Sequence, residues 1–211
     1  MATVKPGSIS HRQRQALQTK HHIVQAARKL FADGGYAETS VDAVAAEAGV
    51  AARTVYATFG NKKAILAAIC EEWLEDAGIR ESIGKGLAEK DLAPRLDIVA
   101  NSCRRQWESE RGVAALLEGA AASDAEVARM QAGWKSDRAA SLRLIFDGLE
   151  AQLRPGVDIR SAGAILRAVT GFEVYKELVV GEGWSPGQYE DWMSGVLKEL
   201  LLPPNPKSAL S

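Results

Sequence analysis

The spacing of apolar residues is the feature that most constrains the fold of this chain. Apolar side chains recur every three or four positions, and a clear example is the run formed by Ile23, Ala26, Ala27, Leu30 and Phe31. This period places the side chains on one face of an α-helix, whereas a strand would need an alternating pattern, which the sequence lacks. At 211 residues the chain is long enough for one sizeable core or two small ones. The sequence therefore predicts an all-α protein.

Two short helices joined by a glycine turn are predicted near the N-terminus. A first helix over 18–33 ends at Gly34-Gly35, and a hydroxyl from Thr39 or Ser40 caps the helix that follows. That helix stops at Gly49, about three residues before a third helix over 52–58. Two short helices with a turn of this length form a helix-turn-helix, in which the second helix enters the DNA major groove.

The charges are divided between two parts of the chain. Residues 1–66 hold nine Lys and Arg against four Asp and Glu, so their balance is 9 − 4 = +5, and they contain all three histidines. The remainder holds 26 − 9 = 17 basic and 27 − 4 = 23 acidic residues, a balance of −6. A basic part joined to an acidic part favours a polyanionic partner for the N-terminal part alone.

The segment TSVDAVAAEAGVAARTVYATFGNKKAIL, residues 39–66, resembles the DNA-binding module of TetR-type transcriptional repressors. The shared pattern is a threonine ahead of the first helix, A-G-V in the turn, T-[LV]-Y-x-x-F in the recognition helix and a lysine after it. The resemblance implies that Ala52 and Arg53 contact base edges. It also implies contacts to the DNA backbone from the remaining polar residues, which are Thr39, Ser40, Thr54, Tyr56, Thr58 and Lys62. Ala51 and Arg53 depart from the pattern, because the family often has a capping serine and a glycine or proline there.

The sequence divides into four parts. A flexible basic arm is expected over 1–17, the helix-turn-helix domain over 18–66, a helical regulatory and dimerisation domain over 67–202, and a disordered tail over 203–211. Arg12 and Arg14 of this arm could contact DNA phosphates or the minor groove. The alternative is that the arm is only a solubilising tail. Gly78, Gly84 and Gly86 mark loose connections after the N-terminal domain. The further helices are expected over 62–77, 92–108, 112–122, 126–153, 159–180 and 186–202.

The last predicted helix carries a long apolar stripe, which packs either on its own domain or on a second subunit. TetR-type repressors pair their last two long helices between subunits, so the resemblance favours a homodimer and a roughly palindromic operator. The interface set expected on this basis is Val174, Leu178, Trp192, Met193, Val196, Leu197, Leu200 and Leu201.

By analogy with the family, several aromatic residues of the larger domain surround a cavity for a small-molecule effector. This set consists of Trp73, Trp107, Trp134, Phe172 and Tyr175. Aromatic residues at helical spacing also form ordinary cores, and the chemistry of the effector stays open. We expect no cofactor and no metal site. Catalysis is not expected either, because all histidines precede residue 23 and neither cysteine lies near a suitable base.

The most favoured function is that of a DNA-binding repressor that a small effector releases. Two alternatives remain: a DNA-binding dimer that acts as an activator or architectural factor without an effector, and a redox sensor that uses Cys70 and Cys103. The two cysteines, the lack of a secretory signal and the lack of an apolar run of about 20 residues predict a cytoplasmic protein without membrane contact.

Overall fold

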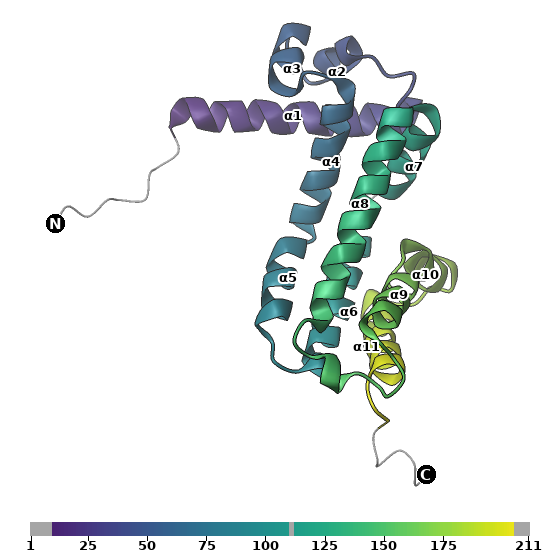
Figure 1. The fold of residues 1–211 in the computed structure, drawn as a ribbon. Helices are drawn as coiled ribbons and strands as arrows, with labels where there is room; N and C mark the ends of the chain where they lie inside the picture. Colours follow the sequence, from purple (N-terminus) through teal and green to yellow (C-terminus); the bar gives the residue numbers. More distant parts are fainter. Residues whose placement is uncertain (1–9, 110–111, 205–211) are drawn as a thin grey trace, which may run out of the picture. The chain divides into compact units, whose positions relative to one another are not determined.

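The computed structural model describes residues 10–109 and 112–204 (Figure 1), and in this part of the chain every regular element is helical. The all-α prediction is therefore confirmed. The elements are α1 (His11–Gly34), α2 (Val41–Glu47), α3 (Ala52–Phe59), α4 (Lys62–Asp76), α5 (Ile79–Ala88), α6 (Leu92–Glu108), α7 (Val113–Ser123), α8 (Ala125–Arg143), η1 (Leu144–Phe146), η2 (Glu150–Gln152), α9 (Ile159–Val169), α10 (Phe172–Tyr175), η3 (Lys176–Gly181) and α11 (Pro186–Leu201). Among these described helices, none has the length and apolar character that a membrane span needs.

The chain folds as two units, and each is described here by itself. The N-terminal unit comprises residues 1–71 and 112–128, and the C-terminal unit comprises 72–111 and 129–211. The predicted domain boundary at residue 66 lies close to the first of these divisions. Nothing in the sequence pattern indicated that α7 and the start of α8 belong with the N-terminal unit.

Helix α1 begins at His11, well before the expected start near residue 18. Ser10 caps it with a complete capping box, in which the Gln13 amide N–H donates to Ser10 Oγ at 3.2 Å and the Ser10 N–H donates to Gln13 Oε1 at 2.8 Å. Residues 10–17 are exposed, so apolar spacing could not reveal their helix, which rests on the cap and on good helix formers. The prediction of a flexible arm is therefore wrong for this stretch, and residues 1–9 lie outside the described part.

The helix-turn-helix has the expected local geometry. Ser40 caps α2 by accepting a hydrogen bond from the Ala43 N–H at 3.1 Å. Gly49 ends the helix with φ of 68°, and the Val50 N–H donates to the Ala45 carbonyl at 3.0 Å. Helix α3 then starts at Ala52 without a side-chain cap, because Ala51 has no hydroxyl to offer. Val44, Val55 and Ile65 are fully or almost fully buried and tie α2, α3 and α4 to one core.

The core of the C-terminal unit lies between α6 and α11, which pack along one another. Leu92, Leu96 and Ala100 on α6 have no exposed area, and neither do the inward residues of α11, which are Tyr189, Met193, Leu197 and Leu201. Helix α11 follows the prediction closely, including its capping box between Ser185 and Gln188.

Helix α5 was not expected, because its two glycines suggested a loop. Gly86 is buried, and a Cβ at its position would lie 3.8 Å from Ile98 and 3.9 Å from Ile145, so the glycine serves close helix packing. Two long helices predicted in this unit are instead interrupted. The first ends at Arg143, where η1 follows, and the second breaks at Thr170 and Gly171, after which the chain continues as α10 and η3.

Candidate DNA-binding interface

The outward face of α3 carries polar side chains that the N-terminal core does not use. Val55 points inward, while Arg53, Tyr56 and Thr58 are exposed, and the Tyr56 side chain keeps 52% of its area in solvent. Arg53 and Tyr56 lie three positions apart and therefore share one side of the helix. This face presents a guanidinium and a phenol hydroxyl to solvent on a helix short enough to enter a major groove.

The other residues predicted on this surface differ in their exposure and in the hydrogen bonds that their side chains make within the chain. Ser40 is exposed and caps α2. Thr58 is exposed, but its hydroxyl donates to the Thr54 carbonyl of its own helix at 2.7 Å. Ala52 and Thr54 are half-buried at the start of α3. Of the predicted set, Arg53 and Tyr56 are the side chains most open to a partner.

Thr39 does not take the predicted role. The residue is buried, and its hydroxyl lies 2.8 Å from the Gly35 carbonyl and 3.2 Å from the Leu30 carbonyl. The single hydroxyl proton is therefore engaged within the chain, where it fastens the end of α1 to the turn before α2. The structure removes the Thr39 side chain from the predicted phosphate contacts.

Lys62 is likewise turned inward. Its ammonium donates to the carbonyls of Tyr36 at 2.6 Å, Ala37 at 3.1 Å and Thr39 at 3.0 Å, and it lies 4.3 Å from the centre of the Tyr36 ring. An ammonium has three hydrogen-bond donors, so this network uses all of them. In this structure the Lys62 side chain clamps the turn between α1 and α2 and does not face outward, so its phosphate contact stays a prediction.

Two other lysines of the N-terminal unit are paired with acids. Lys63 binds Glu126 at the start of α8, and Lys29 on α1 binds Glu47 on α2 at 2.6 Å. The hydrogen bond and the charge of Glu47 raise the pKa of Lys29 above its usual value. The basic character of this unit that the sequence suggested is thus partly used within it, while Arg12, Arg14 and Arg53 remain exposed.

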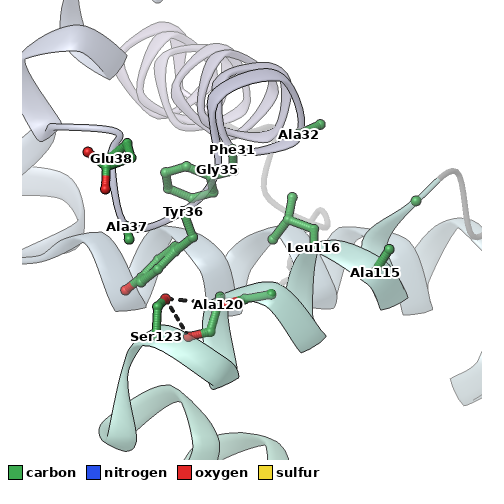
Figure 2. Close-up of a pocket in the computed structure, with 12 residues that line it drawn as sticks. Phe31, Ala32, Gly35, Tyr36, Ala37, Glu38, Ala115, Leu116, Ala120 and Ser123 are labelled. Carbon is green, nitrogen blue, oxygen red and sulfur yellow. Dashed lines mark hydrogen bonds between the residues drawn. The ribbon is translucent and has the colours of Figure 1, made fainter.

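An open cleft of about 500 Å³ lies in the N-terminal unit between the end of α1 and helix α7 (Figure 2). Phe31 and Tyr36 face Leu116, Ala120 and Ser123 across it, and the walls are mainly apolar. Burial raises the pKa of Tyr36 to about 12, with further contributions from the charges of Asp124, between α7 and α8, and Glu126 on α8. Sequence reasoning missed this cleft, because the small residues of α7 are typical of any close-packed helix.

The C-terminal unit brings four of the five predicted effector residues into its core cluster. The rings of Trp73 and Trp107 lie 5.7 Å apart, and those of Trp107 and Phe172 lie 5.3 Å apart. Tyr175 instead pairs with Tyr189 at 5.0 Å. Trp134 is half-buried on α8 and is not part of that cluster as the structure describes it.

Comparison with known proteins bears on the N-terminal unit first. Residues 23–69, which include the buried part of α1 and all of α2 and α3, match the family model described as bacterial regulatory proteins, tetR family. This segment therefore carries the tetR-family pattern that the sequence predicted. The match ends at Ile69, about midway along α4, so it covers the helix-turn-helix and the first half of the helix that follows it.

Relatives and solved structures extend the comparison beyond the tetR-family model. Over 52 residues the chain is 42% identical to a putative mycofactocin biosynthesis transcriptional regulator, MftR, of Mycobacterium tuberculosis, which covers 25% of this chain and 26% of that protein. The chain matches its curated relatives over only about a quarter to a third of their length.

Two solved structures share the fold over most of the chain. NalD of Pseudomonas aeruginosa, the secondary repressor of the MexAB-OprM multidrug efflux pump, has a TM-score of 0.67 at 20% identity, with 89% of this chain and 98% of NalD covered. FadR of Bacillus subtilis in complex with stearoyl-CoA has a TM-score of 0.63 at 21% identity, with 84% and 96% covered. The folds agree while most residues differ.

The interface set that the resemblance to the tetR family suggested needs a correction. Met193, Leu197 and Leu201 have no exposed area, because they form the core of their own C-terminal unit against α6. A side chain already buried in one subunit has no area left to bury against another, so these three residues are wrong as interface residues. Trp192, Val196 and Leu200 lie on other sides of α11, where Leu200 is 39% exposed and the other two are half-buried. Val174 and Leu178 are also half-buried.

Both cysteines are buried free thiols. Burial raises the pKa of Cys70 to about 12 and that of Cys103 to about 11. A redox sensor needs an accessible thiolate, since the thiolate is the reactive form. The surroundings of both thiols therefore speak against the redox alternative.

Proposed function

We propose that this chain is a tetR-family transcriptional regulator that binds a specific DNA sequence through α3 and leaves it when a small effector binds the C-terminal unit. The observation that carries the proposal is the exposed polar face of α3, set behind the Gly49 turn within the segment that matches the family. Such a regulator acts where the DNA is, in the cytoplasm.

In this proposal Arg53 reads a base and its neighbours position the helix. An arginine that points from the first turn of a recognition helix forks onto guanine O6 and N7, a pairing that a smaller residue does not make. Tyr56 on the same face donates its hydroxyl to a phosphate oxygen. Ser40 and the uncapped first turn of α3 offer further donors to the DNA backbone.

Two copies of the chain are proposed to bind one operator. The outer side of the last helices carries Leu200, Trp192 and Val196 on α11 and Val180, whose side chain is 71% exposed. Apolar side chains left in solvent at this density suit a subunit interface. A two-fold dimer would read two half-sites about one helical turn apart, or a multiple of that spacing.

The effector is proposed to bind among Trp73, Trp107 and Phe172 in the C-terminal unit. FadR, which shares the fold, carries stearoyl-CoA in its solved structure, and this supports a small-molecule site on the same scaffold. The chain passes from one unit to the other within α4, so a ligand that shifts this helix would reach the reading helix. About a hundredfold release requires the effector to prefer the released form by roughly 2.7 kcal/mol.

The reading role of α3 is tested by determining the operator from random duplexes and measuring two Arg53 variants. Arg53→Ala should weaken binding by about 1–3 kcal/mol and relax the preference at one or two base pairs. Arg53→Lys should keep the charge and much of the general affinity while losing the preference, because an ammonium lacks the bidentate fork. Lys20→Ala, on an exposed part of α1, is the matched control.

If Arg53→Ala binds the operator and its single-base variants with unchanged ratios, Arg53 does not read a base. The effector mechanism has its own test, in which effector affinity is measured with and without saturating operator. Reciprocity demands that the operator weaken effector binding by the factor by which the effector weakens operator binding. Equal affinities would favour the alternative of a DNA-binding dimer without an effector.

A further inference from the structure

Tyr189 on α11 is a buried polar residue whose hydroxyl lacks a protein partner. Its side chain has no exposed area, and within the described part of the chain its Oη is the one buried side-chain polar atom with no hydrogen bond. Burial is the main reason that the pKa of Tyr189 lies far above its usual value, so the group is a neutral donor. Such an atom is costly to leave unmatched and marks a place where a partner is missing.

Arg138 on α8 supplies a cation next to this part of the core. Its Nη2 donates to both the carbonyl and the hydroxyl of Thr170 at 2.9 Å, and the guanidinium lies 5.9 Å from the centre of the Trp107 ring. Thr170 lies at the break between α9 and α10, and its carbonyl also accepts a hydrogen bond from Trp107 Nε1 at 3.3 Å. A guanidinium has five N–H donors, and Thr170 engages only those of Nη2.

The charge of Arg138 is not balanced by an acid. Within the described residues neither a hydrogen bond nor an ion pair joins it to a carboxylate. Glu108 on α6 and Glu190 on α11 both bind Arg104. A partly buried cation that faces only neutral acceptors favours an anionic ligand and disfavours a cationic one.

The surroundings of Arg138 and Tyr189 are aromatic. Trp107 stacks between Trp73 and Phe172, and Tyr189 packs against Tyr175 and Trp192. Cys103, which is also buried, interacts with both Arg138 and Thr170. Arg138, Thr170 and Cys103 thus form a polar group beside Trp107, and the Tyr189 hydroxyl is buried in the same core among further aromatic rings. A flat apolar body with one charged end matches this arrangement.

We propose that the effector is an aromatic organic acid whose carboxylate pairs with Arg138 and accepts a hydrogen bond from Tyr189, while its ring inserts beside Trp107. The inference rests on the proposed effector function of the C-terminal unit and names the ligand class for that site. Nη1 and Nε of Arg138 form a bidentate pair with the carboxylate, and the Tyr189 hydroxyl gains the acceptor that the core does not give it.

The test uses the full-length protein and a panel of aromatic acids, each with its neutral primary amide and its amine analogue. One such series is indole-3-acetate, indole-3-acetamide and tryptamine, and phenylacetate and benzoate head two more. Binding is followed by titration calorimetry and by the fluorescence of the tryptophans, all five of which belong to the C-terminal unit. At least one acid should bind ten times or more tightly than its amide, and the amines should bind more weakly still.

Two variants separate ligand contact from structural support. Arg138→Gln should abolish the tenfold preference for acid over amide while leaving the affinity for the amide nearly unchanged. Tyr189→Phe should weaken acid binding severalfold without lowering the melting temperature of the free protein, because it removes an unmatched hydroxyl. Arg160→Gln, on an exposed part of α9, should change neither quantity.

The inference is overturned if no acid in the panel binds, if amides bind as well as acids, or if Arg138→Gln keeps the preference. These failures differ from a failure of the proposed function. Operator release by a neutral or cationic compound would sustain the function and refute the acid. An acid that binds through Arg138 and leaves operator affinity unchanged would sustain the anion site and refute its role as an effector site.

Discussion

The N-terminal and C-terminal units place their arginines in opposite ways. Arg53 on α3 is exposed and directed to solvent, whereas Arg95 in the C-terminal unit is buried, with Nε 2.8 Å from the Glu89 carbonyl and Nη1 2.9 Å from the Ile145 carbonyl. An exposed guanidinium stays available to a large polyanion such as a duplex. A buried one needs acceptors from the chain itself or from a molecule small enough to enter. The two units therefore differ in the size of the partner that their cations can meet.

The same contrast between inward and outward side chains applies to the apolar residues of α11. Leu197 is fully buried and Leu200 is 39% exposed, although they are only three positions apart. Leu197→Asp should destabilise the C-terminal unit by more than about 4 kcal/mol, because it places an unpaired charge in a packed core. Leu200→Asp should leave the unit folded and weaken dimer formation. Sedimentation measures the assembly, and tryptophan fluorescence during denaturant unfolding measures the stability of this unit.

The matched pair keeps the two outcomes apart. A folded Leu197→Asp protein would mean that α11 does not form the core of the unit. A Leu200→Asp protein that remains dimeric at low concentration would place the subunit interface away from this side of α11. Loss of operator affinity should accompany the monomer, since a single unit loses the second half-site.

How far the sequence predicted each unit depends on the range of the interactions involved. In the helix-turn-helix, Ser40, Gly49 and Gly60 act on backbone groups within a few residues, so their signals are legible in the sequence and the ends of α2 and α3 were predicted closely. The role of Lys62 could not be predicted, because the carbonyls of Tyr36 and Ala37 that accept its hydrogen bonds lie about 25 residues earlier in the chain. A basic side chain that is close to a recognition helix in sequence need not face the same way.

The C-terminal unit was harder to predict for the same physical reason. The break at Thr170 is held by Trp107 and Arg138, which are 63 and 32 residues away. Gly86 looked like a loop residue because its packing against Ile145 comes from a distant segment. Four of the five aromatic candidates lie in one core cluster, and their role at an effector site stays a prediction. Tyr189 and Arg138 were missed, since nothing in the local pattern marks a buried hydroxyl without a partner.

Lys62 and Lys63 offer a test of this distinction at adjacent positions. Lys62→Ala removes three hydrogen bonds from a charged donor to the turn between α1 and α2, and should destabilise the N-terminal unit by about 2–4 kcal/mol. Lys63→Ala removes a surface pair with Glu126 and should cost at most about 1 kcal/mol. Hydrogen exchange of α1 to α3 reports on this unit, and tryptophan fluorescence should stay unchanged.

Operator affinity is the second measurement for the Lys62 and Lys63 variants. Lys62→Ala should lower operator affinity only as far as it unfolds the unit, so affinity should recover at low temperature or with a stabilising osmolyte. A loss of affinity for all duplexes that persists while the unit is fully folded would restore a direct phosphate contact for Lys62. Equal stability of the two lysine variants would refute the clamp.

Glycines provide the smallest and most local comparison between the units. Gly49 in the N-terminal unit has φ of 68°, whereas Gly133 lies within α8 of the C-terminal unit, and a Cβ added there would meet nothing within 4 Å. Gly49→Ala should destabilise the N-terminal unit by about 1–2 kcal/mol, because an L-residue is strained in the left-handed region. Gly133→Ala should stabilise α8 by about 0.5–1 kcal/mol, since alanine loses less backbone entropy in a helix. Hydrogen exchange of α2 and α3 and the fluorescence midpoint measure the two effects separately. If both substitutions changed stability in the same direction, the backbone conformation at Gly49 and Gly133 would not explain their effects.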